Sequence, residues 1–154
     1  MYKSIPEFPD YMINEEGQVM SMKFNKIKLL KQSIRGHGYY GVLLCKDKKV
    51  YCQKIHRLLG ITFLNCPDNM QIDHIDGNRV NNSLSNLRVV TRQENQFNRT
   101  TAKGYYFRKD IGKWMAQICS NWKVKHLGCF NSEEEARAAY LKAKEIYHVI
   151  EIRS

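Results

Sequence analysis

Alternating apolar and polar positions in the first half of the chain predict short strands with one helix. YYGVLLC (39–45) and VYCQKI (50–55) flank a Lys-Asp-Lys-Lys turn, a pattern typical of an antiparallel hairpin. A short apolar helix is expected to follow, from His56 to about Leu64. Before the hairpin, YMI and QVMSM surround an Asn-Glu-Glu-Gly turn and predict further short strands within residues 1–30.

The next stretch, QIDHIDGNRVNNSLSNLRVVTRQEN (71–95), predicts a hairpin that leads into a helix. IDHI is a strand end, DGNRVNNSLSN is a turn-rich loop and LRVV is a second strand. Thr91 and Glu94 have the spacing of a capping box, with Thr91 as N-cap. The carboxamide of Asn95 is therefore expected on the first turn of the helix.

The last third of the chain predicts three strands and one helix. GYYFRKDIGKWMAQICSNWKVKHLGCF (104–130) divides at Asp-Ile-Gly and Ser-Asn turns. Ser132 and Glu135 form a second capping-box pattern, and the apolar face of the following helix comprises Ala136, Ala139, Tyr140, Ala143 and Tyr147. The whole pattern predicts an α+β protein.

Charge favours a polyanionic partner. The 154-residue chain has a formal net charge of +10, and the stretch from Lys23 to Arg57 holds ten Lys or Arg against one acid. A solvated basic surface is the alternative interpretation. Five cysteines without a C-x-x-C pair indicate neither a disulfide framework nor a structural zinc site. The amino terminus lacks the apolar core of a signal peptide and no apolar run is long enough for a membrane, so we expect an intracellular protein.

Residues 73–95 contain the groups needed to hydrolyse a phosphodiester with one divalent cation. Asp73 and Asn95 offer hard oxygen ligands for Mg²⁺ or Mn²⁺. Neutral His74 is the candidate general base for the attacking water, and Asn86 is expected to orient its ring by a hydrogen bond. Neighbouring strand residues point to opposite sides, so Asp73 and His74 can serve the cation and the water separately.

A structural explanation of these residues must be weighed as well. A lone Asp-His pair is more often a turn residue beside a partly exposed histidine, and Asn78, Asn81 and Asn82 have the positions of turn formers. The ordered combination of Asp-His, strand, capped helix and helical amide favours a site. We interpret His56, at the head of an apolar helix, as a structural or backbone-contacting residue.

The pattern D-H-I-D-G-N-x-x-N-N-x-x-x-N-L-R-x-x-T-x-x-x-N resembles the HNH signature of phage and intron-encoded homing endonucleases. The resemblance runs from about Gly38 to Asn98 and implies a ββα-metal core that binds one cation. It assigns His74 as general base, Asp73 and Asn95 as metal ligands and Asn86 as the residue that positions His74. Asn95 stands where many members have His, which implies an altered metal preference.

Residues 104–147 resemble the APETALA2-type DNA-binding domain, which implies a three-stranded antiparallel sheet on one helix with the sheet in the major groove of DNA. Along one strand Lys113, Met115 and Gln117 alternate with Trp114, Ala116 and Ile118, so one set can face DNA and the other the helix. Trp114 and Trp122 are either core or DNA contacts. Our DNA-contact candidates are Arg108, Lys109, Lys113, Gln117 and Lys123.

These patterns predict a three-part, site-specific, metal-dependent endonuclease of double-stranded DNA. Its parts are an accessory DNA-contact segment at 1–30, a ββα-metal nuclease domain at 36–100 and an APETALA2-like domain at 103–150; residues 2–23 also resemble, weakly, a module that precedes HNH domains. A DNA-binding regulator with an inactive nuclease core is the rival hypothesis, and a non-specific or RNA-directed nuclease is a further one. A monomer that nicks and a homodimer that cuts both strands are both compatible with the sequence.

Overall fold

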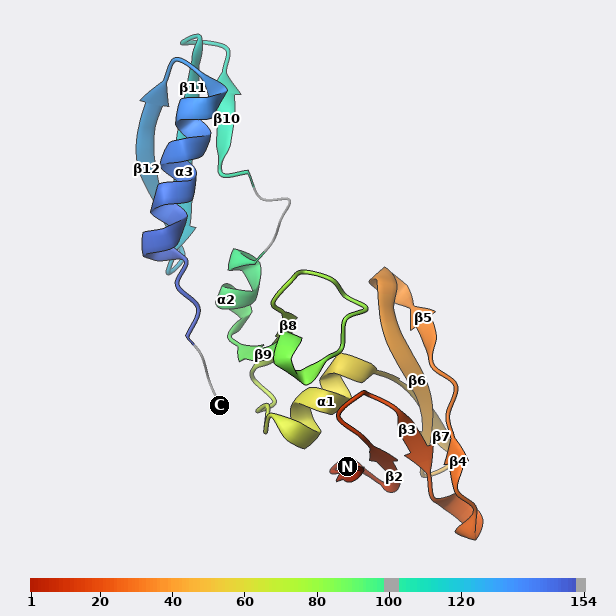
Figure 1. Cartoon of the computed structure of the whole chain (residues 1–154). Helices are drawn as coiled ribbons and strands as arrows, with labels where there is room; N and C mark the ends of the chain where they lie inside the picture. Colours follow the sequence, from red (N-terminus) through yellow and green to blue (C-terminus); the bar gives the residue numbers. More distant parts are fainter. Residues whose placement is uncertain (99–102, 152–154) are drawn as a thin grey trace. The chain divides into compact units, whose positions relative to one another are not determined.

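The chain forms two compact units, residues 1–95 and 96–151, each built of helices and antiparallel strands (Figure 1). The structure is a computed structural model, and it describes residues 1–98 and 103–151. The predicted α+β class is confirmed. In the described part of the chain, no helix is long and apolar enough to cross a membrane.

The first unit begins with a four-stranded antiparallel sheet. Its strands follow chain order: β1 (Lys3–Ile5), β2 (Phe8–Ile13), β3 (Val19–Ser21) and β4 (Lys28–Leu29), with a 3-10 turn at Lys23–Asn25. The Asn-Glu-Glu-Gly turn joins β2 to β3, where Asn14 Oδ1 accepts a hydrogen bond from the Gln18 backbone N–H. Gly17 has a φ of 79°, a conformation that glycine adopts without strain.

A second sheet contains the predicted hairpin. It consists of β5 (Ser33–Arg35), β6 (Tyr39–Lys46) and β7 (Lys49–Lys54), with a 3-10 turn at Gly36–Gly38. Asp47 and Lys48, between β6 and β7, both have positive φ, as a two-residue hairpin turn requires. Helix α1 (Ile55–Phe63) follows β7 directly, which confirms the predicted helix.

Helix α1 is central to the core of the first unit and contacts β1, β2 and β6 to β9. The buried apolar side chains of this core come from residues 5–19 as well as from residues 42–89. Gly60 allows α1 to lie close on β8, because a Cβ there would meet Ile72 Cγ1 at 2.3 Å. Residues 1–30 therefore share one hydrophobic core with the predicted nuclease region.

The third sheet is the hairpin of β8 (Gln71–His74) and β9 (Leu87–Val90), followed by α2 (Arg92–Phe97). A 3-10 turn at Leu84–Asn86 precedes β9. The predicted capping box is present: Thr91 Oγ1 accepts from the Glu94 N–H, and Glu94 Oε2 accepts from the Thr91 N–H. These local hydrogen bonds start α2 directly after β9 and so fix where Asn95 lies.

The second unit has the predicted three strands and one helix. Strands β10 (Tyr105–Arg108), β11 (Lys113–Ser120) and β12 (Lys123–Phe130) form an antiparallel sheet, and α3 (Glu133–Tyr147) packs on it (Figure 1). Ser132 Oγ caps α3 by accepting from the Glu135 N–H. Ile118 packs against Tyr140 and Ala143 of the helix in a small core.

Candidate functional site

The register of the β8–β9 hairpin decides which side chains meet. Asp73 pairs with Arg88, and His74 pairs with Leu87. Because side chains alternate along a strand, Gln71 and Asp73 share one side of β8, while His74 lies on the other. The predicted separation of Asp73 from His74 is therefore present in the hairpin.

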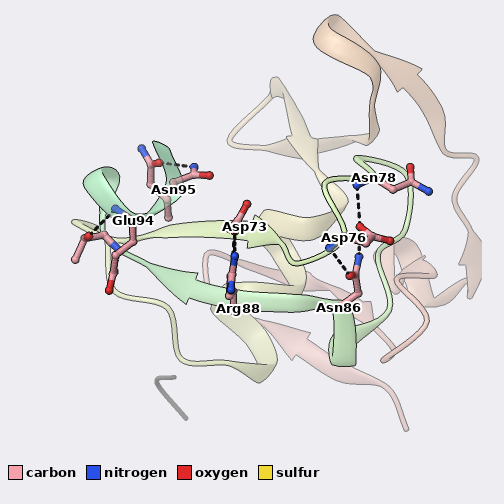
Figure 2. Close-up of polar contacts among 9 residues, drawn as sticks. Asp73, Asp76, Asn78, Asn86, Arg88, Glu94 and Asn95 are labelled. Atoms are coloured by element: carbon pink, nitrogen blue, oxygen red, sulfur yellow. Dashed lines mark hydrogen bonds and ion pairs between the residues drawn. The ribbon is translucent and has the colours of Figure 1, made fainter. Parts of the chain in front are cut away.

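Asp73 is a buried carboxylate that is neutralised by a cross-strand arginine. It is 8% exposed. Arg88 donates twice to the same oxygen, Asp73 Oδ2, from Nε at 3.0 Å and from Nη2 at 2.8 Å. The other carboxylate oxygen points away from Arg88 (Figure 2). The ion pair compensates the burial of the charge and fixes the orientation of the carboxylate.

Asn95 is held at the side of β8 that carries Asp73. Its Nδ2 donates to Gln71 Oε1 at 2.7 Å, which turns Asn95 Oδ1 away from Gln71 (Figure 2). Gln71 lies two residues before Asp73, on the same side of the strand. One carboxylate and one amide oxygen, each fixed by a neighbour, suit a hard cation that keeps water and phosphate as its other ligands.

No group of three or more His, Cys, Asp and Glu side chains with metal-binding geometry occurs among residues 1–98 and 103–151. The predicted ligand pair consists of Asp73 and Asn95, and only Asp73 is one of these four residue types. The pair is therefore smaller than a three-residue metal site. The two donors nevertheless fit Mg²⁺ or Mn²⁺, because the anionic oxygen of Asp73 and the uncharged amide oxygen of Asn95 are both held in fixed positions.

His74 is buried, and its ring is oriented by Asn82. The Nε2 atom lies 3.0 Å from Asn82 Oδ1. An amide oxygen only accepts hydrogen bonds, so Nε2 is the donor in this contact. The ring also packs against His56, with centroids 5.0 Å apart, and against Tyr39, at 6.0 Å.

The contact expected between Asn86 and His74 is corrected by the structure. Asn86 Nδ2 donates to Asp76 Oδ1 at 2.9 Å, and its Oδ1 accepts from the Asp76 N–H at 3.1 Å (Figure 2). The same Nδ2 also donates to the Asn81 carbonyl at 2.9 Å. Asn86 ends the turn before β9 and faces the carboxylate of the loop. Its hydrogen bonds therefore shape the loop, and Asn82 contacts the ring.

The remaining asparagines of the loop converge on Asp76. Asp76 Oδ1 accepts from the Asn78 N–H and Asp76 Oδ2 accepts from Asn81 Nδ2, both at 2.8 Å. Hydrogen bonds from Asn81 and Asn86, followed by that from the Asn78 backbone, lower the pKa of the Asp76 carboxyl. The loop thus stays folded around an ionised carboxylate, and its path brings Asn82 to His74.

Sequence reasoning did not identify Asn82, Arg88 or Gln71 as parts of the site. Arg88 carried a signal, because it lies opposite Asp73 once the hairpin register is known. Gln71 also carried one, since it lies two residues before Asp73. No feature of the sequence distinguishes Asn82 from the neighbouring asparagines of the loop.

The DNA-contact candidates of the second unit lie on the sheet and its turns. Arg108 forms an exposed ion pair with Asp110, in which Nε donates to Oδ1 at 3.0 Å. The lysine candidates are exposed, while Gln117 is half-buried. The exposed lysines are Lys109, Lys113 and Lys123.

One residue of the expected outer face of β11 is buried, because Met115 is 7% exposed. The pairing of β11 with β12 shifts between Ala116 and Gln117, where Leu127 is an extra residue on β12. A bulge of this kind lies on β12 and leaves the period of two along β11 unbroken. Trp122 is 75% exposed at the β11–β12 turn, whereas Trp114 is half-buried beside Phe107.

Comparison with known proteins concerns this same hairpin. A family model described as "HNH endonuclease" matches residues 53–97, from the end of β7 through α1, β8, β9 and α2. The H-N-H endonuclease F-TflI of Escherichia phage T5 is 33% identical over 136 residues, which cover 80% of this chain and 68% of that protein. The chain belongs to the HNH endonuclease family.

Other HNH endonucleases agree with this assignment. A solved structure described as "DNA binding and cleavage by the HNH homing endonuclease I-HmuI" matches with a TM-score of 0.56 and 30% identity over 82% of this chain and 76% of that chain. The H-N-H endonuclease F-TflII of Escherichia phage T5 is 36% identical over 107 residues, 68% of this chain. The chain spans about half the length of F-TflII, 54%.

Proposed function

We propose that this HNH family member is a site-specific, divalent-metal-dependent endonuclease of double-stranded DNA. The observation that carries the proposal is the β8–β9–α2 unit, in which Asp73 and Asn95 are oriented on one side of β8 and His74 on the other. This unit lies within the residues that match the family. The relatives are named as endonucleases, and the net charge of +10 suits a polyanionic substrate.

In this mechanism His74 acts as general base. Its Nδ1 accepts a proton from the attacking water, while Asn82 holds the proton on Nε2 and keeps the ring in place. Asp73 and Asn95 would hold one Mg²⁺ or Mn²⁺. When bound, that cation supplies positive charge for the developing phosphorane and the departing 3′ oxygen. Asn86 acts through the loop that positions Asn82.

Arg88 adds an electrostatic constraint to this mechanism. It binds one oxygen of Asp73 and so provides a counter-charge for the buried carboxylate when no cation is bound. The remaining oxygen points away from the arginine and is the one we assign to the cation. Arg88 thus holds Asp73 in an orientation in which the carboxylate would offer that oxygen to a cation.

We further propose that the second unit is an APETALA2-like DNA reader. A three-stranded antiparallel sheet with one helix supports this proposal, as do the exposed lysines at the turns. Arg108→Ala should weaken DNA binding without changing the metal dependence of cleavage. Unchanged affinity across a salt titration would remove Arg108 from the contacts.

We keep the predicted functional division into 1–30, 36–100 and 103–150 as part of this proposal. The first segment contributes DNA contacts, although its buried side chains belong to the same core as the nuclease region. One site per chain cuts one strand per encounter, so a monomer would nick and a homodimer would cut both strands.

The proposal is tested by incubating the purified protein with a supercoiled plasmid library in Mg²⁺, in Mn²⁺ and in EDTA. Discrete nicks or breaks at a recurring sequence, present with metal and absent with EDTA, are the expected result. Salt-sensitive DNA binding without cleavage in any cation would instead identify a DNA-binding regulator with an inactive nuclease core.

A further inference from the structure

A cleft of about 430 Å³ opens beside the candidate site in the first unit. Its walls include Tyr39, Lys54, His56, Arg57, Gln71 and Asn95. Two of these side chains are cationic, and none of the described lining residues is an Asp or a Glu. Asn95 and Gln71 connect the cleft to the side of β8 that carries Asp73. The charge of the walls favours an anion.

The amino-terminal turn of α1 forms part of this cleft. Helix α1 begins at Ile55, and its N-cap residue, Lys54, makes no side-chain capping hydrogen bond. The first turn contains no acidic residue. Backbone N–H groups at a helix start carry partial positive charge and usually meet a capping oxygen or a carboxylate. Here the N-cap is a lysine, and the first turn contains a histidine and an arginine in place of the usual acidic residues. This arrangement suits a bound anion.

His56 provides an independent observation at the same place. The residue is 8% exposed, and its Nδ1 is buried without a hydrogen-bond partner. A buried polar nitrogen without a partner costs stability that an apolar ring of similar size would not. The pKa of His56 is lowered from 6.5 to about 3, mainly by burial, so the ring is neutral and offers one N–H donor.

Neighbouring side chains hold the cationic groups at the cleft. Lys54 Nζ lies 4.7 Å from the centroid of the Tyr39 ring, which itself packs on His56 at 4.7 Å. Arg57 Nη1 donates to the Met70 carbonyl at 2.8 Å. Both charges are therefore held by contacts within the protein and need little further ordering to meet a ligand.

We propose that this cleft binds a backbone phosphate of the DNA strand that enters the active site. The N-terminal turn of α1 and the His56 imidazole donate hydrogen bonds to the phosphate oxygens, and Lys54 supplies charge. Since Asn95, a proposed ligand of the cation, also lines the cleft, the phosphate is a neighbour of the scissile one. The inference rests on the proposed endonuclease function and assigns His56, so far a structural residue, a contact to the substrate.

The test measures DNA affinity in EDTA, where cleavage is absent, by fluorescence anisotropy of a labelled duplex over a range of salt. His56→Phe, which keeps a ring but loses both nitrogens, should weaken binding by about tenfold at every salt concentration. His56→Asn places an amide near the position of Nδ1 and His56→Gln near that of Nε2, so one of them should restore most of the affinity. Unchanged affinity in His56→Phe overturns the proposal.

Lys54→Gln is the matched variant for charge. This side chain is exposed, so the substitution leaves the fold intact, and it should reduce the slope of log affinity against log salt by about 0.9. His56→Phe should leave that slope unchanged, because a neutral ring releases no counterion. A wild-type slope in Lys54→Gln contradicts the phosphate assignment even if His56→Phe fails to fold.

Inorganic phosphate distinguishes a free anion from the DNA backbone. If it raises the melting temperature of the wild type but the variants bind DNA normally, the cleft is a free-phosphate site and the DNA assignment is wrong. Asn82→Ala separates this inference from the proposed function, since it leaves the ring packed on His56 in place and should bind DNA like the wild type while its cleavage slows. A wild type that cleaves while His56 and Lys54 variants bind normally overturns the cleft alone, whereas absence of both binding and cleavage overturns the function.

Discussion

His56 predicts a measurable pH dependence of stability for the first unit. Burial, followed by the charges of His74, Lys54 and Arg57, lowers the pKa of His56 from 6.5 to about 3. Below pH 6.5 the unfolded chain binds a proton at this residue that the folded chain does not bind. Stability must therefore fall as the pH falls from 6.5 towards 3.

The size of the effect follows from the two pKa values. A pH of 5 lies about 1.5 units below the ordinary pKa of histidine, so His56 is protonated in the unfolded chain. In the folded chain it is still neutral at this pH. Each unit corresponds to about 1.4 kcal/mol, so His56 should cost about 2 kcal/mol of unfolding free energy between pH 8 and pH 5. His56→Phe removes the titrating group, and its stability should depend on pH by about 2 kcal/mol less than that of the wild type over this range.

The assay is urea unfolding at several pH values, followed by NMR at the buried methyl groups of Leu58 and Leu59. These probes report on the first unit, whereas both tryptophans, Trp114 and Trp122, belong to the second. Parallel pH profiles for the wild type and His56→Phe would refute the buried neutral histidine. The opposite result is that the wild type becomes more stable than the variant as the pH falls. It would show that protonated His56 acquires a partner in the folded state.

Three further variants test the contacts of the site and the core. Asn82→Ala should lower the cleavage rate by about tenfold or more with little change in DNA affinity, measured by single-turnover nicking, because the His74 ring loses the acceptor that fixes its tautomer. Arg88→Gln should destabilise the metal-free protein by about 3 kcal/mol and make its melting temperature more responsive to Mn²⁺ than that of the wild type, since the buried Asp73 loses its counter-charge. Gly60→Ala should cost about 1–3 kcal/mol in urea unfolding, because the added methyl group meets β8; unchanged stability would mean that the helix shifts freely.

Features set by neighbouring residues were predictable from the sequence. The β6–β7 hairpin follows from alternation and a polar turn, and the start of α2 follows from the capping box of Thr91 and Glu94. Such signals depend on hydrogen bonds over three or four residues. They placed Asp73, His74 and Asn95 on the right elements.

Features set by the path of a loop were not predictable. Which asparagine meets His74 depends on how the loop wraps around Asp76, and the structure brings Asn82 there while Asn86 bonds the loop. The Asp73–Arg88 pair depends on the hairpin register. On β12 the extra residue Leu127 shifts the pairing with β11, and a period of two does not indicate such a bulge.

The most direct test of the central claim is cleavage by His74→Ala beside the wild type on a plasmid that carries a mapped cleavage site. Nicking is followed in Mg²⁺ and in EDTA, and DNA affinity is measured on the same preparations. The account predicts metal-dependent nicking by the wild type, no detectable nicking by the variant, and equal affinity of the two proteins for the site. Nicking by the variant at the wild-type rate would contradict the account, because the proton of the attacking water would then be accepted elsewhere.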